Sequence, residues 1–163
     1  MNVVYLLLGS NLSDRSALLN RARKEISSRI GNITRESSIY ESESWGFHSE
    51  QMFLNQVIRL DTILNPLQIL NEIFKIESEL GRIRSDGQCY FSRLIDIDIL
   101  FFNDEIINEA KLTIPHPKIP DRMFTLLPLS ELDATMIHPG NRKSIGELII
   151  DCQDRLNVYP YHP

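Results

Sequence analysis

Cysteine is scarce in this chain, and its placement excludes two kinds of site. The two cysteines, Cys89 and Cys152, stand far apart and form no C-x-x-C pair, and the histidines are few and scattered. Structural zinc sites need closely spaced cysteine and histidine ligands, and small disulfide scaffolds need many more cysteines. The sequence therefore predicts free thiols in a reducing compartment, which we interpret as the cytoplasm.

Long hydrophobic runs and an excess of positive charge are also lacking. The run Val3–Gly9 follows no basic segment and is too short for a signal peptide or a membrane span. The formal net charge is −5, whereas proteins that bind nucleic acid usually present a basic face. We therefore expect neither a membrane nor a nucleic acid as a partner.

What the chain does contain is the composition of an ordinary globular domain. It has 163 residues, of which 42% are hydrophobic and 24% are charged. A domain of this length buries roughly 68–70% of its unfolded surface, so it needs no disulfide or metal ion to hold its fold. We expect one domain over residues 1–163, without internal repeats or low-complexity segments.

Hydrophobic periodicity predicts the order of the elements. Strands are expected over 2–8, 34–40, 53–63 and 93–100, with helices over about 14–30, capped by Ser13, and 66–80. This βαββαβ order is typical of an α+β, ferredoxin-like fold, in which two helices cover one face of an antiparallel sheet. The other face should remain open for a ligand. The C-terminal third, with a short helix near 144–151, should pack onto this domain as an extension.

The segment Arg93–Leu100 carries the strongest chemical signal. Ile95, Ile97 and Ile99 alternate with Asp96 and Asp98, which places the isoleucines on one face of a strand and both carboxylates on the other. Carboxylates spaced in this way can hold hard cations such as Mg²⁺, which combines a few carboxylates with substrate phosphates. A merely solvated polar face is the alternative for an isolated D-x-D pattern.

Other residues of interest surround this strand in the sequence. Arg82, Arg84 and Arg93 bring positive charge close to the carboxylates, and the long polar loop 41–51 holds Trp45, the sole tryptophan. Taken singly, each has a structural alternative: solvated loop arginines, a half-buried loop anchor, a core histidine at His116, and core aromatic residues at Phe53 and Phe124.

Several motifs occur together in one order along the chain. They are Leu8-Gly9-Ser10-Asn11-Leu12, Phe53-Leu54-Asn55, Gly81-Arg82-x-Arg84, Arg93-x-Ile95-Asp96-Ile97-Asp98, and Ile114-Pro-His-Pro117 with Arg122-x-Phe124. This series resembles hydroxymethyl-dihydropterin pyrophosphokinase of folate biosynthesis over almost the whole chain. The resemblance implies a ferredoxin-like α+β monomer that moves a pyrophosphoryl group from ATP to the hydroxymethyl group of a reduced pterin and releases AMP.

The resemblance also implies roles for individual residues. Asp96 and Asp98 match ligands of two Mg²⁺ ions and, with Arg82 and Arg93, the catalytic group. The implied ATP contacts are Glu77, Arg82, Arg93, Ile99, Lys111, Thr113, His116 and Arg122. The implied pterin contacts are Gly9, Ser42, Glu43, Trp45, Phe53, Asn55, Asp96 and Phe124, with Phe53 and Phe124 as a sandwich for the ring and Asn55 reading its edge.

One segment departs from the family pattern. The common form before the D-x-D strand is W-x-P-R, whereas this chain has Tyr90-Phe91-Ser92-Arg93. Serine in place of proline loosens a loop entropically, so we expect altered loop dynamics rather than a different reaction.

Two other function classes fit parts of the pattern. A metal-dependent nucleotidyltransferase also combines a Gly-Ser pair with D-x-D, although there the two lie close together in the sequence, unlike Gly9-Ser10 and Asp96. It would release pyrophosphate rather than AMP. A non-catalytic ferredoxin-like module would bind RNA or a small effector, and for RNA a basic, aromatic sheet face would be expected.

Overall fold

The computed structural model describes residues 1–81 and 94–163. Its main sheet has the strand order β5-β1-β4-β3-β8, and β2 also pairs with β4. These strands span Asn2–Ser10 (β1), Asn32–Glu36 (β2), Tyr40–Ser42 (β3), Phe53–Thr62 (β4), Asp96–Phe102 (β5) and Val158–Pro160 (β8). All pairings are antiparallel. The predicted ferredoxin-like order of strands and helices is thus confirmed.

The strand predicted over 34–40 is in fact two strands. Both β2 and β3 pair with β4, but at different positions along it. Between them Ser37 leaves the regular ladder, and its side-chain oxygen accepts a hydrogen bond from the Val57 amide at 3.0 Å. The break lets β3 continue along β4 toward the loop that precedes Phe53.

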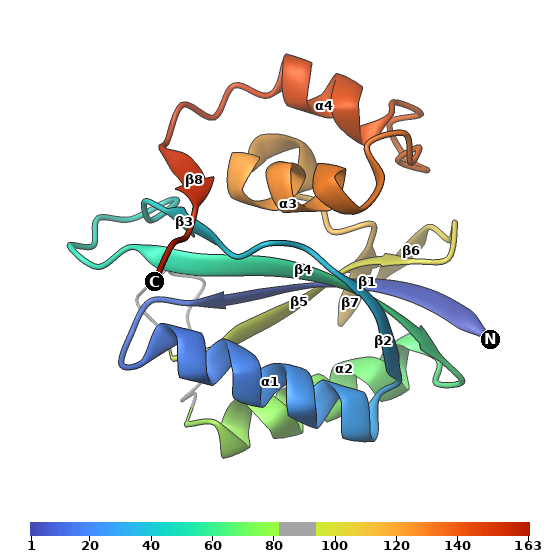
Figure 1. Cartoon of the computed structure of the whole chain (residues 1–163). Coiled ribbons are helices and arrows are strands. Elements are labelled where there is room, and N and C mark those ends of the chain that lie inside the picture. The colour runs from blue at the N-terminus through green and yellow to red at the C-terminus, as the bar shows by residue number, and fades with distance from the viewer. Residues whose placement is uncertain (82–93) are drawn as a thin grey trace.

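Two helices pack on one face of the sheet, as predicted (Figure 1). They are α1, Arg15–Arg29, and α2, Pro66–Glu79. The cap of α1 is Asp14 rather than Ser13, since the Asp14 carboxylate accepts from the Ala17 amide, whereas Ser13 has a positive φ of 61°. The helices and sheet bury a large apolar cluster between them, which includes Leu6, Leu19, Ile26, Ile58, Ile69, Ile73, Ile95, Ile97 and Ile99.

The sequence predicted that the opposite face of the sheet would be open. In the structure it is partly covered. Helices α3, Met123–Asp133, and α4, Ile145–Asp151, lie across it (Figure 1). They bury a second apolar cluster against β1, β4 and β5, which includes Tyr5, Leu7, Val57, Leu100, Phe101, Leu126, Leu129, Leu132, Ile145 and Leu148. The C-terminal third therefore packs onto the domain, as predicted, and leaves only part of this face uncovered.

Smaller elements connect β5 to this second layer. Strands β6, Ile107–Glu109, and β7, Leu112–Ile114, form a hairpin, and a short 3-10 helix spans Ile119–Asp121. This route carries the chain from the end of β5 back past the carboxylates of Asp96 and Asp98, where His116 donates its backbone N–H to Leu100.

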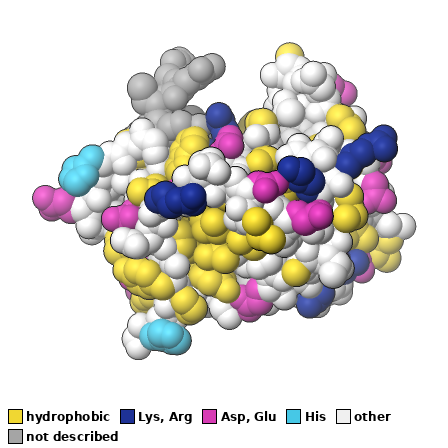
Figure 2. Space-filling view, turned by 90° about the horizontal axis from the view of Figure 1, so that it is seen from above, with side chains coloured by type: hydrophobic (Ala, Val, Ile, Leu, Met, Phe, Trp, Pro, Cys, Tyr) yellow, Lys and Arg dark blue, Asp and Glu magenta, His cyan; other side chains and the backbone are white. Residues whose placement is uncertain are grey.

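The surface is of mixed character. In the view of Figure 2, acidic and basic side chains are interspersed with exposed hydrophobic ones rather than gathered by sign. Among residues 1–81 and 94–163, no helix is long and apolar enough to cross a membrane.

Candidate active site

The register of the central strands places three functional side chains side by side. Gly9 of β1 lies opposite Asn55 of β4 on one side and Asp96 of β5 on the other. Directly opposed residues share a face of the sheet, so Asn55 and Asp96 flank Gly9. Since Gly9 has no side chain, a hollow lies between them. The next row, two residues along, places Asp98 beside Leu7.

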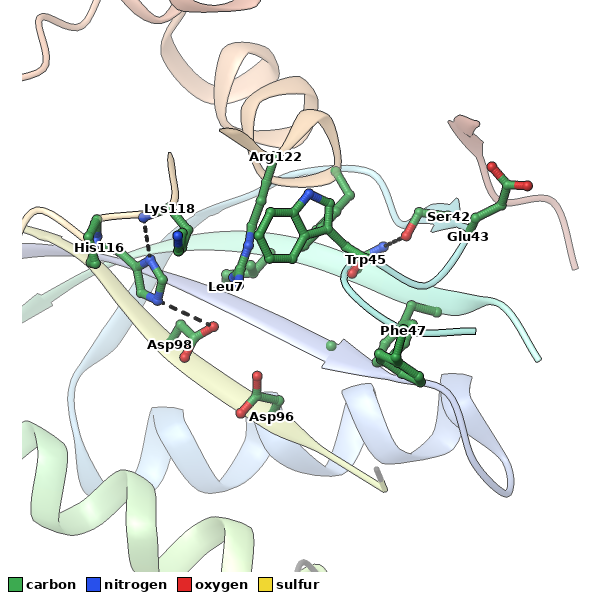
Figure 3. Close-up of a pocket in the computed structure, with 15 residues that line it drawn as sticks. Leu7, Ser42, Glu43, Trp45, Phe47, Asp96, Asp98, His116, Lys118 and Arg122 are labelled. Atoms are coloured by element: carbon green, nitrogen blue, oxygen red, sulfur yellow. Dashed lines mark hydrogen bonds and ion pairs between the residues drawn. The ribbon is translucent and has the colours of Figure 1, made fainter. Parts of the chain in front are cut away.

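A cavity of about 330 Å³ opens above these rows, at the part of the sheet that α3 leaves uncovered. Figure 3 shows the carboxylates of Asp96 and Asp98 below it and Trp45 and Arg122 above. Its lining contains every residue predicted to contact the pterin: Gly9, Ser42, Glu43, Trp45, Phe53, Asn55, Asp96 and Phe124.

A second cavity of about 230 Å³ lies on the other side of the carboxylates. It is lined by most of the residues predicted to contact ATP: Glu77, Ile99, Lys111, Thr113 and His116. Arg122, also predicted as an ATP contact, lines the first cavity instead. Asp96, Asp98, His116 and Pro117 line both cavities. The two hollows therefore meet at the carboxylate pair.

The period-two pattern of β5 is confirmed. Ile95, Ile97 and Ile99 are buried in the α1/α2 cluster, while Asp96 and Asp98 face the cavities. In the described part of the chain, no group of three or more His, Cys, Asp or Glu residues is arranged to hold a metal ion.

His116 is neutral at physiological pH in this arrangement. Burial, together with the charges of Arg122 and Lys118, lowers the pKa of its imidazole to about 4 against the opposing effect of Asp96. Its Nδ1 accepts a hydrogen bond from the Lys118 amide at 3.1 Å, so the proton sits on Nε2. Nε2 lies 3.9 Å from Asp98 Oδ2.

Glu77 holds β5 in place from the other side. Its side chain is almost completely buried, and its Oε1 accepts a hydrogen bond from the Ile97 amide at 3.0 Å. Ile97 stands between the two aspartates. The carboxylate of Glu77 thus fixes the strand that presents them, in addition to lining the second cavity.

The polar edge of the first cavity is preorganised. Asn55 donates from Nδ2 to Ser42 Oγ at 2.8 Å and to the Tyr40 carbonyl at 3.4 Å. Its Oδ1 consequently faces Gly9. Glu43 lines the cavity, but its carboxylate points away (Figure 3) and accepts the Asn157 amide at 2.8 Å.

Aromatic rings form the rest of the lining. Phe53 meets Phe47 edge to face, with ring centroids 6.0 Å apart. The Arg122 guanidinium lies 4.5 Å from the centre of the Trp45 indole and 5.6 Å from that of the Phe124 ring. Lys118 Nζ lies 5.9 Å from the same indole.

Some predicted residues lie outside the described part of the chain, and some lining residues were not predicted. The predicted residues outside the described part are Arg82, Arg93, Cys89 and the Tyr90-Phe91-Ser92 departure. The lining residues that were not predicted include Leu7 and Lys118 in the first cavity and Leu70 and Phe74 in the second. Phe74 has the helical spacing of a core residue, yet it is 39% exposed. Lys118 follows directly on the predicted Ile114–Pro117 motif.

Comparison with known proteins bears on the family and the fold of the chain. The family model described as 7,8-dihydro-6-hydroxymethylpterin-pyrophosphokinase matches residues 5–134. Two similar proteins bear the name 2-amino-4-hydroxy-6-hydroxymethyldihydropteridine pyrophosphokinase. The one from Aquifex aeolicus is 40% identical over 147 residues, covering 90% of each chain. The one from Porphyromonas gingivalis is 43% identical over 141 residues, covering 85% of this chain and 95% of that protein.

Longer proteins match as well. Folic acid synthesis protein fol1 of Pneumocystis carinii is 37% identical over 161 residues, which cover 97% of this chain and 21% of that protein. Among solved structures, HPPK-DHPS of Plasmodium falciparum superposes with a TM-score of 0.73 at 20% identity, covering 93% of this chain and 43% of that chain. This structural likeness supports the fold, and the sequence matches support the family. The chain belongs to the 7,8-dihydro-6-hydroxymethylpterin-pyrophosphokinase family.

Proposed function

We propose that this protein transfers a pyrophosphoryl group from ATP to the hydroxymethyl group of 6-hydroxymethyl-7,8-dihydropterin, giving AMP and the pterin diphosphate. The observation that carries this proposal is the meeting of two cavities at Asp96 and Asp98. One cavity has the aromatic and amide lining of a planar heterocycle site, and the other has the predicted nucleotide contacts. A group passing between two bound substrates must cross such a boundary.

The first cavity suits a pterin. Phe53 and Phe124 offer ring faces for stacking, and Asn55 Oδ1 offers an acceptor for ring N–H groups beside Gly9. Because Ser42 and Tyr40 already occupy the Asn55 amide nitrogen, this side chain is held with its acceptor toward the ligand. We propose that it selects a heterocycle edge that donates hydrogen bonds. Glu43, whose carboxylate points away, would contribute through its backbone.

The second cavity suits a nucleotide. Leu70 and Phe74 supply apolar surface for a base, while Lys111 and Thr113 supply polar groups. Lys118 and Arg122 stand on the far side of the carboxylates. The triphosphate would then extend from the second cavity toward these cations. Arg82 and Arg93, outside the described residues, remain proposed phosphate ligands.

The residues present fit a magnesium site. Asp96 and Asp98 are side by side on one face of β5 and offer only oxygen ligands, which Mg²⁺ prefers together with waters and substrate phosphates. When bound there, two ions would neutralise phosphate charge and lower the pKa of a nearby hydroxyl.

The remaining chemistry rests on the protein's own groups. The hydroxymethyl oxygen attacks the β-phosphorus, the bond from that phosphorus to the oxygen shared with the α-phosphate breaks, and AMP leaves while the hydroxyl proton is released to water. Neutral His116 keeps an N–H on the Asp98 side and can donate it to a phosphate oxygen. The positive charges of Arg122 and Lys118 stabilise the negative charge that develops on the transferred group.

The decisive experiment is incubation with Mg-ATP and the hydroxymethyl-dihydropterin, followed by mass analysis. AMP and a pterin diphosphate are expected in equal amounts. Release of pyrophosphate with an adenylated pterin would instead indicate a nucleotidyltransferase, and failure to bind Mg-ATP would indicate a non-catalytic module.

We expect the enzyme to act as a single-domain monomer in the cytoplasm, where its buried Cys152 would stay reduced. Sedimentation would test the oligomeric state, and cell fractionation would test the location.

A further inference from the structure

Trp45 lines the first cavity, which shares Asp96, Asp98 and His116 with the second. It belongs to the loop between β3 and β4, on the pterin side of the first cavity, yet its indole lies against two cations from the segment before α3. Arg122 is the nearer, with its guanidinium carbon 4.5 Å from the ring centre, and Lys118 is at 5.9 Å. Figure 3 shows the indole beside the Arg122 side chain, above Asp98.

The environment makes this contact strong. Arg122 is only 8% exposed, and a guanidinium taken out of water must recover interaction energy from its surroundings. Tryptophan offers the best aromatic face for a cation, and the attraction grows as water is removed. Trp45 also faces two like charges at once, so its ring offsets their mutual repulsion.

We propose that Trp45 is a positioning residue for nucleotide binding: its indole holds Arg122, and more weakly Lys118, in the first cavity near the shared carboxylates, where a polyphosphate extending from the second cavity would reach them. The pterin-side loop would thereby set the affinity of the nucleotide. This inference rests on the proposed function, because it takes the anion to be the ATP triphosphate.

A double-mutant cycle tests the proposal directly. The probe is a Mg-ATP analogue with a methylene group in place of the oxygen between the α- and β-phosphates, and its Kd is measured by calorimetry. Trp45→Leu should weaken binding by roughly 3- to 30-fold, the range of a desolvated cation–π contact. Trp45→Phe should weaken it less. In an Arg122→Met background, Trp45→Leu should cost less than about 2-fold.

The unliganded protein offers a second readout. Because Trp45 is the sole tryptophan, its emission reports on the contact, and Arg122→Met should shift it before any ligand is added. Tyr159→Leu is the control: it changes an exposed aromatic residue that lines neither cavity, and it should leave the Kd of the analogue unchanged. Circular dichroism would confirm that each variant is folded.

Three results would overturn the inference. They are an unchanged Kd in Trp45→Leu, an equal loss in the Arg122→Met background, and Trp45 emission that Arg122→Met leaves unmoved. Should Trp45→Leu fail to fold, Trp45→Phe and the emission measurement still decide. None of these measurements requires turnover, so a failure to form pterin diphosphate would count against the proposed function separately.

Discussion

Asp96 and Asp98 belong to the site rather than to the core, because the isoleucines between and beside them supply the apolar contacts of β5. We therefore expect Asp96→Ala and Asp98→Ala to lower kcat by at least about 100-fold, since a bound metal ion is worth several kcal/mol to the transition state. The melting temperature should stay unchanged or rise slightly, because one of two neighbouring like charges is removed.

Steady-state kinetics and thermal unfolding check this pair of variants together. Asp104→Asn, which changes an exposed carboxylate in the turn after β5, serves as the control and should behave as wild type. Retention of more than about a tenth of kcat by both alanine variants would contradict the metal assignment.

Gly9 allows a separate test, because its role is to be small rather than to be flexible. A Cβ at this position would lie 3.7 Å from Asn55 Oδ1 and 4.0 Å from Phe53 Cδ1, which are ordinary contacts. Gly9→Ala should therefore fold, with stability unchanged or up to about 1 kcal/mol higher. The added methyl group would nevertheless project into the first cavity, the proposed pterin site.

Pterin binding should consequently weaken while nucleotide binding is retained. Titration of the Gly9→Ala variant with a pterin analogue and, separately, with Mg-ATP measures both affinities, and urea unfolding measures stability. A variant that binds the pterin analogue like wild type would show that the ligand does not approach this row of the sheet.

At the scale of elements, α3 is joined to β3 by one side chain. Glu131 Oε1 accepts from the Ser38 amide and hydroxyl at 2.8 and 2.9 Å, and Oε2 accepts from the Tyr40 hydroxyl at 2.8 Å. Burial raises the pKa of Glu131, but these hydrogen bonds outweigh it and the net shift is downward. Burial, together with the hydrogen bond to Glu131, raises the pKa of Tyr40 to about 12.

A pH-dependent stability follows. The folded state favours the ionised Glu131 carboxylate, so the unfolded state binds more protons near pH 4. The stabilisation by Glu131 is therefore complete above the pKa that this carboxyl has in the unfolded state. It is lost as the pH falls through the pKa that the carboxyl has in the folded state. Glu131→Gln should cost about 1 kcal/mol at pH 7 and less at pH 3. Urea unfolding at both pH values, with Glu109→Gln as the exposed control, measures the difference; an equal cost at both would contradict the assignment.

The elements also show how far sequence patterns reach. The alternation of Ile95 to Ile99 with the two aspartates predicts β5 and its two faces, because a strand repeats every two residues. By contrast, α3 is not indicated by a polar and an apolar stripe. Its Thr125, Leu126, Pro128, Leu129 and Leu132 are all buried, and a proline within the segment argues against a helix.

Some residues that line the cavities were hard to predict. Lys118 reaches the first cavity only because the chain turns back past β5, and Phe74 is exposed beside the second cavity although its spacing is that of a core residue. Both positions are set by contacts between distant segments, which no local period encodes. The motif residues were predictable because their pattern resembles a family, not because their spacing alone places them in a cavity.

At the scale of the whole molecule, one sheet serves two layers. Strands β1, β4 and β5 contribute alternate residues to the cluster under α1 and α2 and to the cluster under α3 and α4. The residues of the candidate active site stand on the second face, beyond the end of α3. Loss of either layer would therefore disturb the strands that carry Asn55, Asp96 and Asp98.

We accordingly predict that the chain unfolds as one cooperative unit. Leu19→Ala removes a fully buried side chain from the first cluster, and Leu126→Ala removes one from the second. Each should lower the free energy of unfolding by about 2–5 kcal/mol, and Leu67→Ala, at a 45% exposed position, by far less. Within each variant, Trp45 emission and far-UV circular dichroism should give one urea transition with the same midpoint. That midpoint will differ between variants as their stability differs. If Leu126→Ala instead produced a separate early transition in one probe, the second layer would be an independently unfolding part, and the site would depend on that part alone.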